Sequence, residues 1–119
     1  MKISERQRRF PQMVAELIKY AYDRGFELSL GEAYRTEEQQ RIYVESGRSK
    51  TMDSRHRDRL AIDLNLFKDG VYIKDGGSYR TLGERWETLG GRGGGRFGVR
   101  PEEYGARVGW DANHFEYAG

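Results

Sequence analysis

The sequence predicts an α+β fold in which helices pack on a small antiparallel sheet. Two segments repeat apolar residues at helical spacing, and others alternate apolar with polar residues, which is the period of a half-buried strand. The dipeptide Asp69-Gly70 is a strong signal for a two-residue hairpin between alternating segments. Because the 119 residues contain no internal repeat or linker, we expect a single domain, 1–119.

Three helices are expected from this pattern. Pro11 suits the first helical position, and Gly25 offers a C-terminal cap for the same helix. A capping box opens the second helix at Thr36, and Gly47 closes it. The third covers 81–89. The core-facing residues of the first and third helices are predicted to be Val14, Leu17, Ile18, Ala21, Leu82, Trp86 and Leu89.

Four strands are expected to form the sheet. The first is 26–30, and the second, 60–67, turns its even-numbered apolar residues toward the core. The third, 71–73, returns from the hairpin, and the fourth, 110–117, supplies a short C-terminal strand. The glycine-rich stretch 90–98 is predicted to be a loop.

Composition excludes several functional classes. The 21 Lys and Arg nearly balance the 19 Asp and Glu, and a net charge of +2 argues against a dedicated nucleic-acid binder. The absence of cysteine excludes disulfides and thiolate metal ligands. Since no apolar run reaches membrane-spanning length and the first residues lack a secretory h-region, we expect a protein made in the cytoplasm without a signal peptide or membrane insertion. We also expect a monomer.

The two histidines of the chain each lie near carboxylates, as a catalytic zinc site requires. Asp63 points away from the apolar face of its strand, and His56 lies seven residues earlier, where a loop can fold it back. His114 must then come from a neighbouring strand. Two imidazoles and one carboxylate suit Zn²⁺ and leave a fourth position for a water, whose pKa falls to about 7 on the metal.

Four further side chains complete the predicted active site. Asp111 is the candidate general base, and Glu116 could accept the second ring N–H of a ligand histidine. Arg35 could bind a substrate carboxylate or stabilise the tetrahedral oxyanion, and Ser54 could hydrogen-bond substrate or the metal ligands. The alternative for each residue is an ordinary surface or loop position.

Three ordered motifs resemble one known family. Segment 54–63 resembles the Ser-x-His-(x)6-Asp motif of the zinc D-Ala-D-Ala carboxypeptidase family, also called the peptidase M15 or VanY/VanX-like family. Segment 32–36 followed by Gln39 is similar to the family's strand-to-helix segment, and segment 111–116 resembles its closing His-Phe-Glu motif. The resemblance covers roughly 11–117, nearly the whole chain.

The resemblance implies a Hedgehog/DD-peptidase-like fold, with zinc bound by His56, Asp63 and His114 and with Asp111 as the catalytic base. With Asp at position 111, the closing motif most resembles that of the L-alanyl-D-glutamate endopeptidase branch, which includes phage endolysins and bacterial wall-remodelling enzymes. The implied activity is a metalloprotease-type hydrolase that cuts the L-Ala-D-Glu bond of the peptidoglycan stem peptide. Such an enzyme acts on the cell wall or in the periplasm, for example after phage-mediated release.

Three alternatives stay open at the level of sequence. The same mechanism could cut D-Ala-D-Ala, as a carboxypeptidase or dipeptidase does. Segment 91–97 could be an RGG-like nucleic-acid segment, although a single short copy is more simply a flexible loop. The chain could also be a non-catalytic wall-binding domain with a structural zinc, which the candidate base and the open ligand position argue against.

Overall fold

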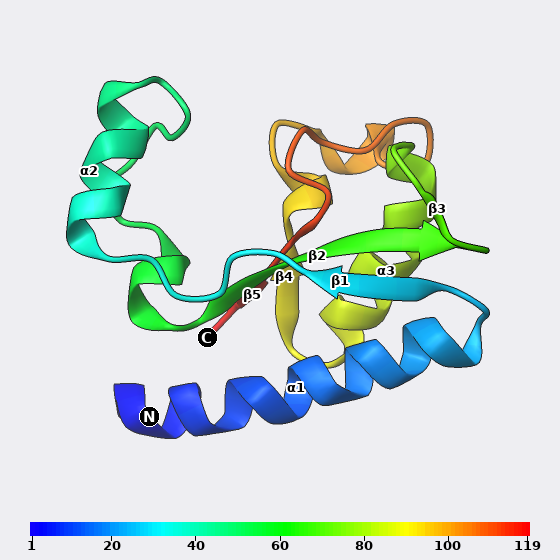
Figure 1. Ribbon diagram of the computed structural model, residues 1–119, viewed down its shortest axis with the longest axis horizontal. Helices are drawn as coiled ribbons and strands as arrows, with labels where there is room; N and C mark the ends of the chain where they lie inside the picture. The colour runs from blue at the N-terminus through cyan, green and yellow to red at the C-terminus, as the bar shows by residue number, and fades with distance from the viewer.

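A computed structural model describes all of residues 1–119, with three α-helices and one antiparallel sheet of five strands. Helices α1 (Ile3–Asp23) and α3 (Gly76–Thr88) lie together against one face of the sheet. Helix α2 (Glu37–Glu45) stands apart from both, beyond the start of β2 (Ala61–Lys68) (Figure 1). The predicted α+β class is confirmed. None of the helices combines the length and the hydropathy that crossing a membrane requires.

Strand β2 is the centre of the sheet. Its C-terminal half pairs with β1 (Glu27–Leu30) and with β3 (Val71–Tyr72), whereas its N-terminal end pairs with β5 (His114–Tyr117). Strand β4 (Gly91–Gly93) is added at the far edge of β5. All of these pairings are antiparallel, so β2 and β5 run side by side in the middle of the molecule.

The predicted alternation along β2 is confirmed. Leu60 and Leu64 are fully buried, whereas Asp63 faces the opposite side and stays partly exposed. The predicted hairpin follows, because Asp69 and Gly70 have φ values of +52° and +77°, as a two-residue turn of this kind needs. One face of β2 therefore belongs to the hydrophobic core, and the other is free to carry polar chemistry.

Helix α1 begins at Ile3, so the prediction that Pro11 is its first residue was wrong. The reason is Phe10, whose ring is buried edge-on against Trp86 with ring centroids 5.7 Å apart. Burying a large apolar side chain is worth about 1.5–3 kcal/mol, which is comparable to the roughly 3 kcal/mol that an internal proline costs a helix. Pro11 itself is exposed, so its ring does not crowd the core.

Side-chain caps set the starts of the other two helices. The predicted start of α2 is confirmed, since the Thr36 hydroxyl accepts the backbone N–H three residues later at 3.0 Å, and Gly47 follows the helix with φ +80°. The start of α3 was predicted at Thr81, which was wrong. Asp75 accepts the Ser78 N–H at 2.9 Å and caps the helix earlier, ahead of two glycines that conceal its first turn from sequence-based prediction.

The prediction that 90–98 is a loop was also wrong, because this stretch contains β4 and the 3₁₀ turn η2 (Gly94–Arg96). Gly91 packs so closely against Trp86 that a Cβ would overlap the indole ring. Here glycine permits close packing and does not signal flexibility. Strand β5 is shorter than predicted, since 110–113 forms a turn that leads into it.

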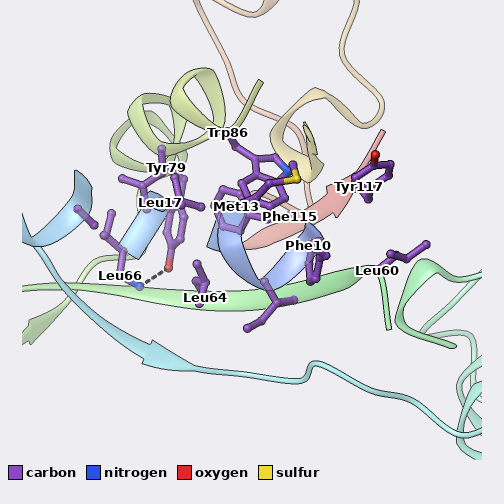
Figure 2. Close-up of a cluster of buried hydrophobic side chains, with 13 residues drawn as sticks. Phe10, Met13, Leu17, Leu60, Leu64, Leu66, Tyr79, Trp86, Phe115 and Tyr117 are labelled. Carbon is purple, nitrogen blue, oxygen red and sulfur yellow. Dashed lines mark hydrogen bonds between the residues drawn. The ribbon is translucent and has the colours of Figure 1, made fainter. Parts of the chain in front are cut away.

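The core lies between the two helices and the inner face of β2 and β5 (Figure 2). Its two internal hydrogen bonds connect α3 to both strands. The Trp86 indole N–H donates to the Glu116 carbonyl at 2.8 Å, and the Leu66 N–H donates to the Tyr79 hydroxyl at 2.9 Å. Helix α3 thereby fixes the two strands whose outer faces carry the candidate site.

Candidate metal centre and active site

The outer face of the β2–β5 pair brings the three predicted zinc ligands together. Asp63 on β2 lies directly opposite His114 on β5 in the strand register. His56 comes from the 3₁₀ turn η1 (Arg55–Asp58), just before β2. One ligand atom from each residue lies within 4.8 Å of the other two, and both histidines are buried.

The spacing of these atoms fits a tetrahedral zinc ion. His56 Nε2 is 3.2 Å from Asp63 Oδ1 and 3.2 Å from His114 Nδ1, and the third side of the triangle, from His114 Nδ1 to Asp63 Oδ1, is 3.5 Å. Tetrahedral zinc with bonds of about 2.0–2.1 Å holds its nitrogen and oxygen ligands about 3.3 Å apart. The triangle therefore matches one face of the tetrahedron and leaves the fourth corner for solvent or substrate.

Both imidazole rings are held by their second nitrogen. His56 Nδ1 lies 3.0 Å from the Ala33 carbonyl oxygen, which can only accept, so Nδ1 carries the proton and Nε2 presents its lone pair. His114 Nε2 lies 2.8 Å from Glu116 Oε1, which leaves Nδ1 free toward the site. Such outer contacts fix the tautomer and orientation of metal-binding histidines. Glu116 is thus placed where its predicted role requires.

The electrostatics of this group favour a cation. Burial alone would raise the pKa of Asp63, but hydrogen bonds with His114 and His56 outweigh it and lower that pKa to about 2. Burial opposes a charge on His114, yet its contacts with Asp63 and Glu116 raise its pKa to about 9. A site that stabilises a proton this strongly between carboxylates also suits a divalent metal ion, which would replace the proton.

Asp111 lies beside the ligand triangle without being part of it. Its Oδ2 is 3.8 Å from His114 Nδ1, and its side chain stays 30% exposed to the cleft. Burial raises the pKa of Asp111 above its ordinary value, which makes its carboxylate a better proton acceptor. The turn before β5 therefore places the candidate base beside the triangle of candidate ligand atoms.

Arg35 and Ser54 lie on the other side of the site, in a network that the sequence did not reveal. The Arg35 guanidinium forms an ion pair with Glu32 and donates to Gln40 Oε1 at 2.7 Å and to Ser54 Oγ at 3.4 Å. Ser54 Oγ also accepts the His56 N–H at 3.3 Å and so caps the ligand-bearing turn η1. Arg35 therefore reaches the cleft as the cationic half of an ion pair with Glu32.

An open cleft of about 800 Å³ lies over these residues. One side of its lining comes from α2 and the segment up to η1, and the other comes from β4, β5 and the segment between them. On this second side, the Phe97 ring packs against His114 with centroids 5.6 Å apart, and Trp110 is 72% exposed. Neither aromatic residue was predicted from the sequence, because both lie outside the motifs, in segments predicted to be a loop and a strand.

The glycines of segment 91–97 have a packing role beside the site. Gly94 lies against the turn before β5, where a Cβ would overlap the Asp111 carbonyl oxygen and approach His114 Cβ to 2.9 Å. The Arg96 guanidinium pairs with Glu87 at 2.9 Å. The segment is thus folded against the candidate metal site, and its glycines are explained by this close packing without an RGG-like nucleic-acid segment.

Gly94→Ala is expected to destabilise the chain by about 1–3 kcal/mol, the usual cost of forcing an extra methyl into a packed region. Denaturant unfolding of zinc-free protein measures the change. Gly105→Ala is the matched control, because a Cβ there meets nothing within 4 Å, and its stability should stay close to that of the wild type. Equal stability of the two variants would contradict the close approach at Gly94.

Several solved structures share the fold of this chain. The Serratia marcescens L-Ala D-Glu endopeptidase ChiX matches with a TM-score of 0.68 and 23% identity, over 97% of this chain and 85% of that one. The chain has the fold of the peptidase M15 type. This confirms the predicted DD-peptidase-like fold.

Two further solved structures share the fold. The vancomycin resistance D,D-pentapeptidase VanY from a VanB-type cassette, in complex with Zn(II), matches with a TM-score of 0.61 and 23% identity, over 93% of this chain and 71% of that one. The LD-carboxypeptidase LdcB matches with a TM-score of 0.62 and 21% identity, over 93% of this chain and 64% of that one. No protein-family model and no curated protein sequence matches the chain.

Proposed function

We propose that the chain is a zinc-dependent peptidase that hydrolyses the peptidoglycan stem peptide at the L-Ala-D-Glu bond, in endolysin-like degradation of the cell wall. The observation that carries this proposal is the triangle of His56, Asp63 and His114, which has tetrahedral spacing and no fourth protein ligand, with Asp111 Oδ2 3.8 Å from His114 Nδ1. A structural zinc site would have four protein ligands, whereas this one has three and a candidate base. A solved L-Ala D-Glu endopeptidase with the same fold supports the choice of bond.

The residues around the ligand triangle have separable roles in this mechanism. His56, Asp63 and His114 would hold the zinc ion, which would supply a Lewis acid to activate water and polarise the scissile carbonyl. Asp111 accepts a proton from the attacking water and passes it to the leaving amine. Glu116 holds the His114 ring in the orientation that presents Nδ1. Arg35, on the opposite side, stabilises negative charge that develops on the carbonyl oxygen.

Digestion of purified peptidoglycan tests the proposal directly. The chain is loaded with zinc, incubated with intact sacculi, and the released fragments are identified by mass spectrometry. We expect sugar fragments that retain L-Ala alone, together with peptides that begin at D-Glu. If zinc-loaded protein releases no peptide from peptidoglycan or from soluble muropeptides, the chain is not a peptidase of this class.

Cleavage of D-Ala-D-Ala is the second candidate, since VanYB shares the fold and its structure holds D-alanine-D-alanine. The same digestion separates the two reactions. A D,D-carboxypeptidase shortens the stem peptide by its terminal D-Ala and leaves the rest on the sugar. Loss of D-Ala without any peptide that begins at D-Glu would therefore replace the first proposal with the second.

Arg35→Ala is expected to reduce kcat/KM by roughly 30-fold or more, the equivalent of about 2 kcal/mol of lost charge-assisted stabilisation. Zinc should stay bound, because a guanidinium cannot be a metal ligand. Turnover and metal content are measured on the same preparation. Arg41→Ala is the matched control, because Arg41 lies on the exposed side of α2, 3.6 Å from Glu37. Wild-type turnover by the Arg35 variant would show that Arg35 has only a structural role.

A further inference from the structure

The cleft is lined by more cations than the proposed mechanism uses. Three of them already have oxygen partners within the chain. Arg35 pairs with Glu32, and Arg92 Nε lies 3.6 Å from Glu116 Oε2. The third is Arg55, whose guanidinium donates to the Gly119 carbonyl at 3.2 Å. The cations that line the cleft are Arg35, Arg48, Lys50, Arg55 and Arg92.

Arg48 and Lys50 are the two cations of the cleft that form neither an ion pair nor a hydrogen bond with the chain. Of these, Arg48 is the oriented one, because its guanidinium stacks on the Tyr43 ring 4.7 Å from the centroid. Tyr43 is itself fixed, since its hydroxyl donates to Glu32 Oε2 at 3.1 Å. A stacked guanidinium keeps its N–H groups in one plane and free for a planar anion such as a carboxylate.

We infer that Arg48, and not Arg35, binds a free carboxylate of the substrate and makes the enzyme selective for it. The inference rests on the proposed function and names the determinant of its substrate class. In γ-linked D-Glu, the α-carboxylate stays free on the carbon that bears the scissile nitrogen, and amidation of that group removes its charge. Arg35 and Arg48 both stack on the Tyr43 ring. The positive charge of Arg35 is already balanced by Glu32, whereas Arg48 has no acidic partner, so Arg48 is the better partner for an anion.

Two synthetic stem peptides test the inference, one with D-Glu and the other with its α-amide, D-isoglutamine. Wild-type chain is expected to cleave the acid at least about tenfold better in kcat/KM, the effect of one charge-assisted hydrogen bond. Arg48→Gln should lose this preference by slowing only the acid, and Arg48→Lys should keep part of it. Arg24→Gln is the control, since Arg24 stacks on Tyr20 at 4.2 Å at the end of α1, outside the cleft.

Binding of the same two peptides to zinc-free protein, measured by calorimetry, gives a readout that needs no catalysis. Tighter binding of the acid that disappears in Arg48→Gln supports the inference, even if neither peptide is cleaved and the proposed function fails. Equal cleavage of both peptides by wild type would overturn the inference while the proposed function stands. An acid preference that survives in Arg48→Gln would also overturn it and assign the carboxylate to another cation.

Discussion

Replacing His56 or His114 by alanine is expected to weaken zinc binding by more than about 100-fold, because loss of a residue that only supports a ligand already costs 10–100-fold. Each variant leaves two ligands of a triangle whose atoms now lie 3.2–3.5 Å apart. The remaining imidazole and Asp63 cannot complete a tetrahedral site. Metal analysis after dialysis against a defined zinc buffer should find one zinc per wild-type chain and almost none in either variant.

Trp110→Ala is the control for this experiment, since Trp110 lines the same cleft but offers no ligand atom. It should keep its zinc. Full zinc occupancy in His114→Ala at neutral pH would show that the ligand assignment is wrong. Because metal that binds only the folded chain adds to its stability, a chelator should also lower the melting temperature of wild type. An unchanged melting curve would contradict a metal site built into the sheet.

The predictions that the structure confirms depend on local patterns. Alternation along 60–67 was sufficient to predict that Asp63 leaves the core face, because side chains in a strand point to opposite sides in turn. The cap at Thr36 and the turn at Asp69-Gly70 are also local signals, since each is made by residues within one turn of backbone. The fold class and the orientation of one ligand follow from such signals.

The predictions that failed depend on contacts between distant segments. Pro11 would mark the helix start only if no residue before it were buried in the core. Phe10 is buried there, because its ring packs against Trp86 on α3. The glycines at 91–95 predict a loop by composition. In the structure, a side chain at Gly91 would overlap the Trp86 indole, and one at Gly94 would overlap the Asp111 carbonyl. A single sequence does not show which segment packs against a glycine, so its role could not be predicted.

In the candidate site, too, the features set by local sequence were predicted, whereas those set by contacts between segments were not. The pattern of histidines and carboxylates predicted which residues could hold a metal, and the structure places them together. The sequence did not reveal that Glu32 pairs with Arg35, because this ion pair depends on how β1 leads into α2. It also did not single out Arg48, one of 21 basic residues, whose distinction is its stack on Tyr43 and its lack of an acidic partner.

Asp111→Asn is expected to fold, to keep its zinc and to lose about a hundredfold or more of peptide-bond cleavage, the range for removing general acid–base assistance. The amide keeps the shape of the side chain but cannot accept a proton at neutral pH. Zinc should stay bound because Asp111 Oδ2 lies 3.8 Å from His114 Nδ1, outside the triangle of ligand atoms. Zinc content and muropeptide release are measured on one preparation, with Asp58→Asn, outside the cleft, as the matched control.

A general base and a metal ligand fail differently in this experiment. Loss of zinc together with activity would make Asp111 a fourth ligand and would weaken the case for an open catalytic corner. Full activity with zinc bound would make it a bystander, and Glu116 would then be the nearest alternative base. That second result would require Glu116 to release the His114 ring, which it now holds at 2.8 Å, so the geometry favours Asp111. Retained zinc with a deep loss of turnover is the outcome that the position of Asp111 predicts.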